Sequence, residues 1–74
     1  MKKVIYVDGT FDLIHTGHIE FFKECKKYGN YLIVGVLSDK NVQSYKREPI
    51  INLDNRCFML ENIEIVDKVI SQLN

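Results

Sequence analysis

The order of the apolar segments is the strongest constraint on the fold of this chain. Residues 4–7 form a continuous apolar run that ends at Asp8 and Gly9, a pattern typical of a strand buried on both faces of a parallel sheet. From Ile14, apolar positions recur every three or four residues and predict a helical face with these members: His18, Phe21, Phe22, Cys25 and Tyr28. Residues 31–37 repeat the buried-strand pattern. A strand, a helix and a second strand form a βαβ unit, which predicts a parallel sheet.

The second half of the chain predicts one more helix and one more strand. Pro49 holds residues 44–49 out of a helix, and a new helical pattern opens at Leu53. Residues 66–70 are typical of a short strand. The 74 residues suffice for one small domain or part of one. We therefore expect an α/β fold whose sheet stops after its third strand, whereas an average sheet has about five.

Composition and charge exclude several classes of protein. Ten basic and ten acidic side chains give a net charge of zero, so charge gives no reason to expect nucleic acid or a membrane surface as a partner. The longest apolar stretch, residues 31–37, is far shorter than the roughly 20 residues that cross a bilayer. Cys25 and Cys57 lack the spacing of a disulfide framework or a zinc site and are expected to be buried free thiols. We expect a cytoplasmic protein without a membrane span.

Residues 8–18, where the first strand meets the first helix, carry the most chemistry. Ligands of open α/β sheets bind at this edge, and the N–H groups of a helix N-terminus attract anions. Gly9 and Gly17 are predicted to let a phosphate chain approach the backbone without a Cβ in its path. His15 and His18 lie three residues apart, so both imidazoles can point at one group and neutralise charge on a triphosphate.

Other interpretations of this segment compete with phosphate binding. The two histidines can be structural side chains beside a loop, or a zinc pair, although no third ligand stands at a recognisable spacing. The run that ends in Asp8, Gly9 and Thr10 is also similar to a phosphohydrolase signature, but Tyr6 occupies the position of the aspartate nucleophile and closes that route. The chain contains neither GxGxxG nor GxxxxGK[ST], so it has no dinucleotide fingerprint and no P-loop.

Residues 9–12, Gly-Thr-Phe-Asp, and residues 15–18, His-Thr-Gly-His, resemble the signature of the cytidylyltransferase family of HxGH nucleotidyltransferases. Further segments are similar to the lysine loop, the arginine helix and the closing strand of phosphoethanolamine and phosphocholine cytidylyltransferases: 44–50, 54–56 and 66–70. Glycerol-3-phosphate cytidylyltransferase is similar too. The resemblance covers nearly the whole chain. It implies a Rossmann-like three-layer α/β/α fold in which residues 1–74 are the N-terminal part of a single catalytic domain.

The same resemblance implies an activity and assigns residues to it. CMP would pass from CTP to a phosphorylated alcohol such as phosphoethanolamine, phosphocholine or glycerol 3-phosphate, with release of pyrophosphate and with Mg²⁺ accompanying the nucleotide. His15, His18 and Lys46 would be catalytic, and Asp39 would lie on the acceptor side; no metal ligand is identified. The nucleotide would be bound by Gly9, Thr10, Phe11, Gly17 and Arg56. From composition alone, Lys46 and Arg56 are expected to be solvated surface residues.

Two alternatives to this activity stay open. The family's segment Arg-Thr-x-Gly-Ile-Ser-Thr, which closes over the nucleotide, is not found in residues 1–74, so we expect a fragment with weakened or lost catalysis. A non-catalytic nucleotide-binding or dimerisation half-domain is therefore the first alternative. The second is an adenylyltransferase of the same superfamily. A homodimer is expected in either case, because a truncated sheet exposes an apolar edge and face.

Overall fold

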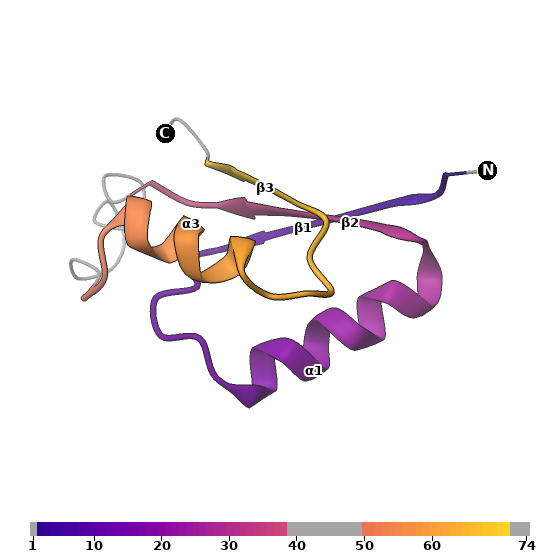
Figure 1. The fold of residues 1–74 in the computed structure, drawn as a ribbon, viewed down its shortest axis with the longest axis horizontal. Coiled ribbons are helices and arrows are strands. Elements are labelled where there is room, and N and C mark those ends of the chain that lie inside the picture. The colour runs from indigo at the N-terminus through magenta and orange to yellow at the C-terminus, as the bar shows by residue number, and fades with distance from the viewer. Residues whose placement is uncertain (1, 39–49, 72–74) are drawn as a thin grey trace.

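The computed structural model describes residues 2–38 and 50–71, which form a three-stranded sheet with two helices (Figure 1). The elements are, in chain order, β1 (Val4–Gly9), α1 (Thr16–Cys25), the 3-10 turn η1 (Lys26–Tyr28), β2 (Tyr31–Val36), α3 (Leu53–Glu61) and β3 (Lys68–Ser71). The strand order is β1-β2-β3, and both pairs of strands are parallel. The predicted α/β fold with a parallel sheet is confirmed.

Both helices lie on the same side of the sheet (Figure 1), so the described residues form two layers of the predicted three-layer sandwich. Successive side chains of a strand point to opposite faces. Along β1, Ile5 and Val7 are half-buried and pack against the core, whereas Val4 and Tyr6 are 49% and 47% exposed. The expectation that the first strand is buried on both faces was therefore wrong for the described residues, because they supply helices to one face only.

The core lies between the central strand β2 and the two helices. Its buried members are Phe11, Phe22, Leu32, Val34, Val36 and Leu60. Phe22 supplies the buried aromatic ring of α1, whereas Phe21, which the spacing placed on the same face, is 49% exposed. Neighbouring helical positions are separated by about 100° around the axis, so the sheet covers one of these two rings and leaves the other outside.

The boundaries of the second half follow from local hydrogen bonds. α3 begins at Leu53 as predicted, and the side-chain oxygen of its N-cap, Asn52, accepts a hydrogen bond from the Asn55 N–H at 2.9 Å. β3 begins at Lys68, two residues later than predicted, because the Val66 N–H donates to the Ile63 oxygen in a turn. In residues 2–38 and 50–71, no helix combines the length and the apolar character needed to cross a membrane.

Cys25 and Cys57 are both free thiols and both half-buried. Each packs against the hydrophobic core. Burial raises the pKa of both thiols above the ordinary value, so they are protonated and unreactive near neutral pH.

Asp67 joins the start of β3 to the start of β2. Its carboxylate accepts hydrogen bonds from the Leu32 N–H at 2.7 Å and from Lys26 Nζ at 3.0 Å. The Asp67 N–H in turn donates to the Leu32 oxygen. The Leu32 N–H, and after it Lys26, holds the pKa of Asp67 below its ordinary value, because both stabilise the ionised form. The carboxylate thereby sets the register of β3, an edge strand of four residues, against β2.

The substitution Asp67→Asn is expected to destabilise the protein by about 1 kcal/mol at neutral pH, because a partly exposed, charge-assisted contact is lost. The folded-state pKa of Asp67 lies below the ordinary 3.8, so its contribution is complete above that value and is lost as the pH falls through the lower, folded-state pKa. Urea denaturation at several pH values checks this. The difference between wild type and variant should vanish in acid; a constant difference would contradict the assignment.

Candidate functional site

The candidate site is the loop between β1 and α1, at the edge where the parallel strands end (Figure 1). The Leu37 N–H donates to the oxygen of Gly9, the last residue of β1, at 3.0 Å, which extends the pairing of the two strands one residue past the end of β2. The chain then crosses the edge and enters α1, whose N-cap is His15. The loop, the end of β2 and the N-terminus of a helix therefore meet where open α/β sheets bind ligands.

His15 and His18 cap α1 reciprocally. His15 Nδ1 accepts a hydrogen bond from the Gly17 N–H at 2.9 Å, and His18 Nδ1 accepts one from the His15 N–H at 3.1 Å. The ring centroids are 4.4 Å apart, so the structure brings together the two imidazoles as predicted. A neutral imidazole that accepts through Nδ1 carries its proton on Nε2. The cap therefore makes both rings Nε2–H donors on the side of the ring away from the backbone contact.

The surroundings of His18 favour its neutral form. Its ring meets the edge of Phe11 at a centroid distance of 5.8 Å and an interplanar angle of 64°. Burial and, after it, the nearby charge of His15 lower the pKa of His18 below the ordinary 6.5. Protonation of Nδ1 would also break its hydrogen bond with the His15 N–H. His18 therefore donates as an uncharged group at neutral pH.

The two glycines of the loop make room for rings of the loop itself. A Cβ on Gly17 would lie 2.6 Å from Cε1 of His15, and a Cβ on Gly9 would lie 3.2 Å from Cε2 of Phe11. Their predicted role, the close approach of a phosphate, stays a prediction. The structure adds a second reason for glycine at both positions, which the spacing of the motif did not indicate.

Phe11 holds the middle of the loop in an unusual conformation. Its φ is +53°, the left-handed region that non-glycine residues seldom adopt. The residue is 9% exposed, and its ring packs against that of Phe22 at a centroid distance of 5.7 Å. Burial of the ring offsets the backbone strain, so the side chain of Phe11 anchors the loop in the core, while its predicted role, nucleotide binding through the backbone, stays a prediction.

Arg56 differs from the surface residue expected from composition, because its side chain is fully buried. Nε donates to the Ile51 oxygen at 2.9 Å, and Nη1 donates to the oxygens of Thr10 and Leu37 at 2.7 and 2.8 Å. The guanidinium thus joins the end of β1, the end of β2 and the segment before α3. Its predicted contact with the nucleotide stays a prediction.

Asp12 contributes a contact that sequence reasoning missed. Its carboxylate oxygens accept hydrogen bonds from the N–H groups of Ile50 and Ile51 at 2.9 and 2.8 Å. Asp12 belongs to the motif, but no local spacing indicates a partner 38 or 39 residues away. The predicted site residues Lys46 and Asp39 lie outside the described residues. Within residues 2–38 and 50–71, no three His, Cys, Asp or Glu side chains gather as metal ligands.

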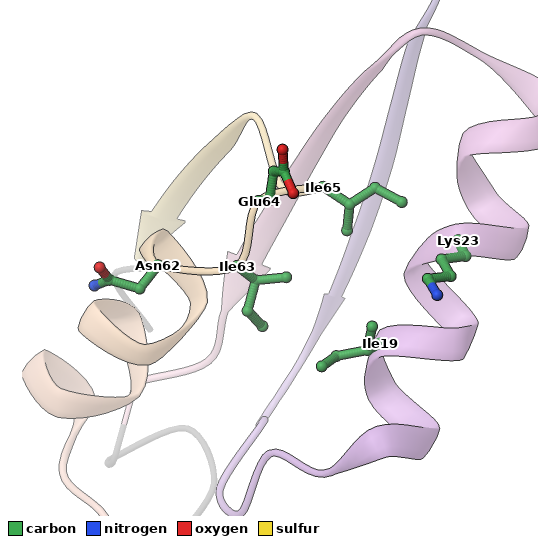
Figure 2. A pocket seen from close by; sticks show the side chains of 6 residues that line it. All are labelled: Ile19, Lys23, Asn62, Ile63, Glu64 and Ile65. Carbon is green, nitrogen blue, oxygen red and sulfur yellow. The ribbon is translucent and has the colours of Figure 1, made fainter.

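A hollow of about 570 Å³ lies between α1 and the segment that follows α3 (Figure 2). Ile19 of α1 and Ile63 of that segment point toward one another across it. Its lining is completed by Lys23, Asn62, Glu64 and Ile65. None of the site residues predicted from the sequence lines this hollow, so it is distinct from the edge that carries the histidines.

Comparison with known proteins gives consistent results. The profile of the family described as cytidylyltransferase-like matches residues 6–72. An FAD synthase of Ferroglobus placidus is 46% identical over 95% of this chain and 45% of its own length. The ethanolamine-phosphate cytidylyltransferase of Dictyostelium discoideum is 44% identical over 92% of this chain and 19% of its own length. The bifunctional protein HldE of Aliarcobacter butzleri is 39% identical over 93% of this chain and 15% of its own length. The chain thus spans less than half of each of these relatives.

One solved structure has nearly the same fold. The lipopolysaccharide core biosynthesis protein from Thermoplasma volcanium superposes with a TM-score of 0.92 and 30% sequence identity, over 97% of this chain and 59% of that one. The described strands and helices therefore correspond to part of a larger α/β protein of known structure.

The substitution Gly17→Ala is expected to lower stability by about 1 kcal/mol, because the new Cβ displaces the ring of His15 and removes the cap. Helix propensity alone predicts the opposite sign, a gain of about 1 kcal/mol. Urea denaturation distinguishes the two. Glu20→Ala, at an exposed position of α1, is the control and should change stability by less than about 0.5 kcal/mol. A stabilised Gly17→Ala protein would contradict the role of the cap.

We expect His18 to titrate below 6.5 as the Nε2–H tautomer. Long-range ¹H–¹⁵N correlation spectra of the imidazoles measure both properties. Since the folded-state pKa lies below the unfolded one, the unfolded protein binds more protons between the two values, so the stabilising contribution is complete above 6.5 and is lost as the pH falls through the lower, folded-state pKa. His15→Asn removes the neighbouring ionisable ring and should raise the pKa of His18. A proton found on Nδ1 of His18 would overturn the assigned tautomer.

Proposed function

Because the chain belongs to the cytidylyltransferase-like family of nucleotidyltransferases, we propose that it transfers CMP from CTP to a phosphorylated alcohol, with release of pyrophosphate. The observation that carries this proposal is the reciprocal cap, which makes His15 and His18 two adjacent Nε2–H donors at the edge of the sheet. Nucleotidyl transfer needs alignment and stabilisation of charge more than covalent help. Two preorganised donors supply that stabilisation.

The reaction is an in-line displacement at the α-phosphorus of CTP. A phosphate oxygen of the acceptor attacks, forms the new phosphorus–oxygen bond and expels pyrophosphate as the bond to the bridging oxygen breaks. Negative charge grows on the leaving and non-bridging oxygens, where His15 and His18 donate. Gly9, Thr10 and Phe11 bind the nucleotide through their backbone, Gly17 lets it approach α1, and Lys46 binds its phosphates. Asp39 lies on the acceptor side. No covalent intermediate with the protein is required.

Mg²⁺ is proposed to enter with the triphosphate. The described residues contain no group of three His, Cys, Asp or Glu side chains that fits a metal ion, so no protein ligand is assigned to it. A cation that is held chiefly by substrate phosphates and water matches the usual coordination of Mg²⁺.

The nucleotide and the acceptor are the finer parts of the proposal. The relatives include both an ethanolamine-phosphate cytidylyltransferase and FAD synthases. CTP with phosphoethanolamine, phosphocholine or glycerol 3-phosphate is the choice supported by the lysine loop, arginine helix and closing strand of the sequence. Turnover with ATP alone would assign the chain to an adenylyltransferase instead.

A second candidate function is a non-catalytic half-domain that binds nucleotide or associates with a second copy. It is favoured by the exposed apolar side chains Val4, Tyr6 and Ile70 on the face of the sheet that the described helices leave uncovered. This candidate predicts nucleotide binding or a homodimer without turnover. Calorimetry with CTP and analytical ultracentrifugation test it, and His18→Ala should leave the association intact.

Release of pyrophosphate, measured with CTP or ATP against the three acceptors, tests the main proposal. We expect weakened turnover with CTP, and we expect His15→Ala and His18→Ala each to lower kcat further, by about 10²-fold or more, because one preorganised donor is lost in each. Glu20→Ala is the matched control on the exposed side of α1 and should retain full activity. If both histidine variants retain wild-type turnover, the proposed role of the imidazoles is wrong.

A further inference from the structure

We infer that Arg56 is a positioning residue, which turns the Thr10–Phe11 peptide so that its N–H becomes a donor to a phosphate held at the two histidines. This inference rests on the proposed function and gives Arg56 a role other than contact with the nucleotide. It begins from the burial of the guanidinium. Three of its five N–H groups donate to backbone oxygens of Thr10, Leu37 and Ile51. A guanidinium that left these oxygens for a ligand would strand them without their charged donor.

The direction of the Phe11 N–H follows from the hydrogen bond to Thr10. In a trans peptide, the carbonyl oxygen and the following N–H point in opposite directions, and the described residues contain no cis peptide. The Thr10 oxygen points at Arg56 Nη1, 2.7 Å away. The Phe11 N–H therefore points away from the buried guanidinium.

Both neighbours of Phe11 are tied to the same segment before α3. Thr10 is held by Arg56, which also binds the Ile51 oxygen. Asp12 is held by the N–H groups of Ile50 and Ile51. A non-glycine residue remains in the left-handed region only when its surroundings determine its conformation. These two ties, together with the buried ring, hold Phe11 at a φ of +53°.

Phe11 also links the oriented peptide to the catalytic side chains. Its ring contacts the ring of His18 at a centroid distance of 5.8 Å, so the residue that carries the oriented N–H also packs against one of the proposed donors. Arg56 thus positions a backbone donor and, through Phe11, one face of His18. A shift of this peptide would change both.

The test follows the amide signals of the loop by NMR during titration with pyrophosphate. In the wild-type protein, the amides of Phe11 and Gly17 should shift together, whereas the Arg56 Nε–H signal should exchange slowly with water and keep its position. In Arg56→Lys, which keeps the charge but cannot reach three oxygens, the melting temperature without ligand should fall, the Phe11 shift should be lost, and pyrophosphate should bind roughly tenfold more weakly. Lys27→Gln, which removes an exposed cation, should change none of these.

Several results would overturn the inference. If the Phe11 amide signal of Arg56→Lys still shifts with pyrophosphate as it does in the wild type, Arg56 only stabilises the fold and does not position this peptide. If Arg56→Lys binds pyrophosphate more weakly but keeps the wild-type melting temperature, Arg56 contacts the anion directly. The same conclusion follows if the Arg56 Nε–H signal of the wild-type protein moves during the titration. The wild-type measurement decides this question even if Arg56→Lys does not fold. If the Gly17 amide of the wild-type protein shifts with pyrophosphate and the Phe11 amide does not, the inference about Arg56 is wrong but the proposed function stands. If no loop amide responds, the proposed function fails with it.

Discussion

The edge of the sheet at which β1 and β2 end depends on the hydrogen bonds of the buried Arg56 guanidinium. Where parallel strands end, their last carbonyl oxygens have no further strand to accept from, and a buried oxygen without a donor costs free energy. One side chain supplies donors to Thr10 after β1, to Leu37 after β2 and to Ile51 before α3. The loop that carries the histidines therefore starts from a backbone position that α3 determines, so folding of the second half of the chain is a condition for the geometry of the first.

In the loop between β1 and α1, the contacts that stabilise the fold are also those on which the proposed chemistry depends. The imidazoles of His15 and His18 satisfy the N–H groups at the start of α1, and by accepting through Nδ1 they become donors through Nε2. Gly17 leaves the space that the His15 ring occupies, as Gly9 does for Phe11. The loop is thus built from rings that pack on one another, and donors held in this way would need little reorganisation in the proposed reaction, when charge develops on a phosphate.

Much of the fold could be predicted because it depends on local patterns. The parallel sheet, the start of α3 at Leu53 and the pairing of the two histidines on one helical turn all follow from spacing. Errors arose where a distant segment decides the outcome. Val4 and Tyr6 are exposed because helices cover one face of the described sheet, and Phe22 rather than Phe21 is buried because the sheet covers a narrow stripe of α1.

The sequence by itself determined the βαβ order, the family signature and the residue types at the edge, because periodicity and motif spacing are properties of short segments. Only the tertiary structure decided the roles of Arg56 and Asp12. The oxygens that Arg56 binds belong to residues as far as 46 positions away, and the amides that Asp12 binds lie 38 and 39 positions away. Whether an arginine on a helix is solvated or buried depends on what the fold packs against it, and that information is spread over three separate segments of the chain.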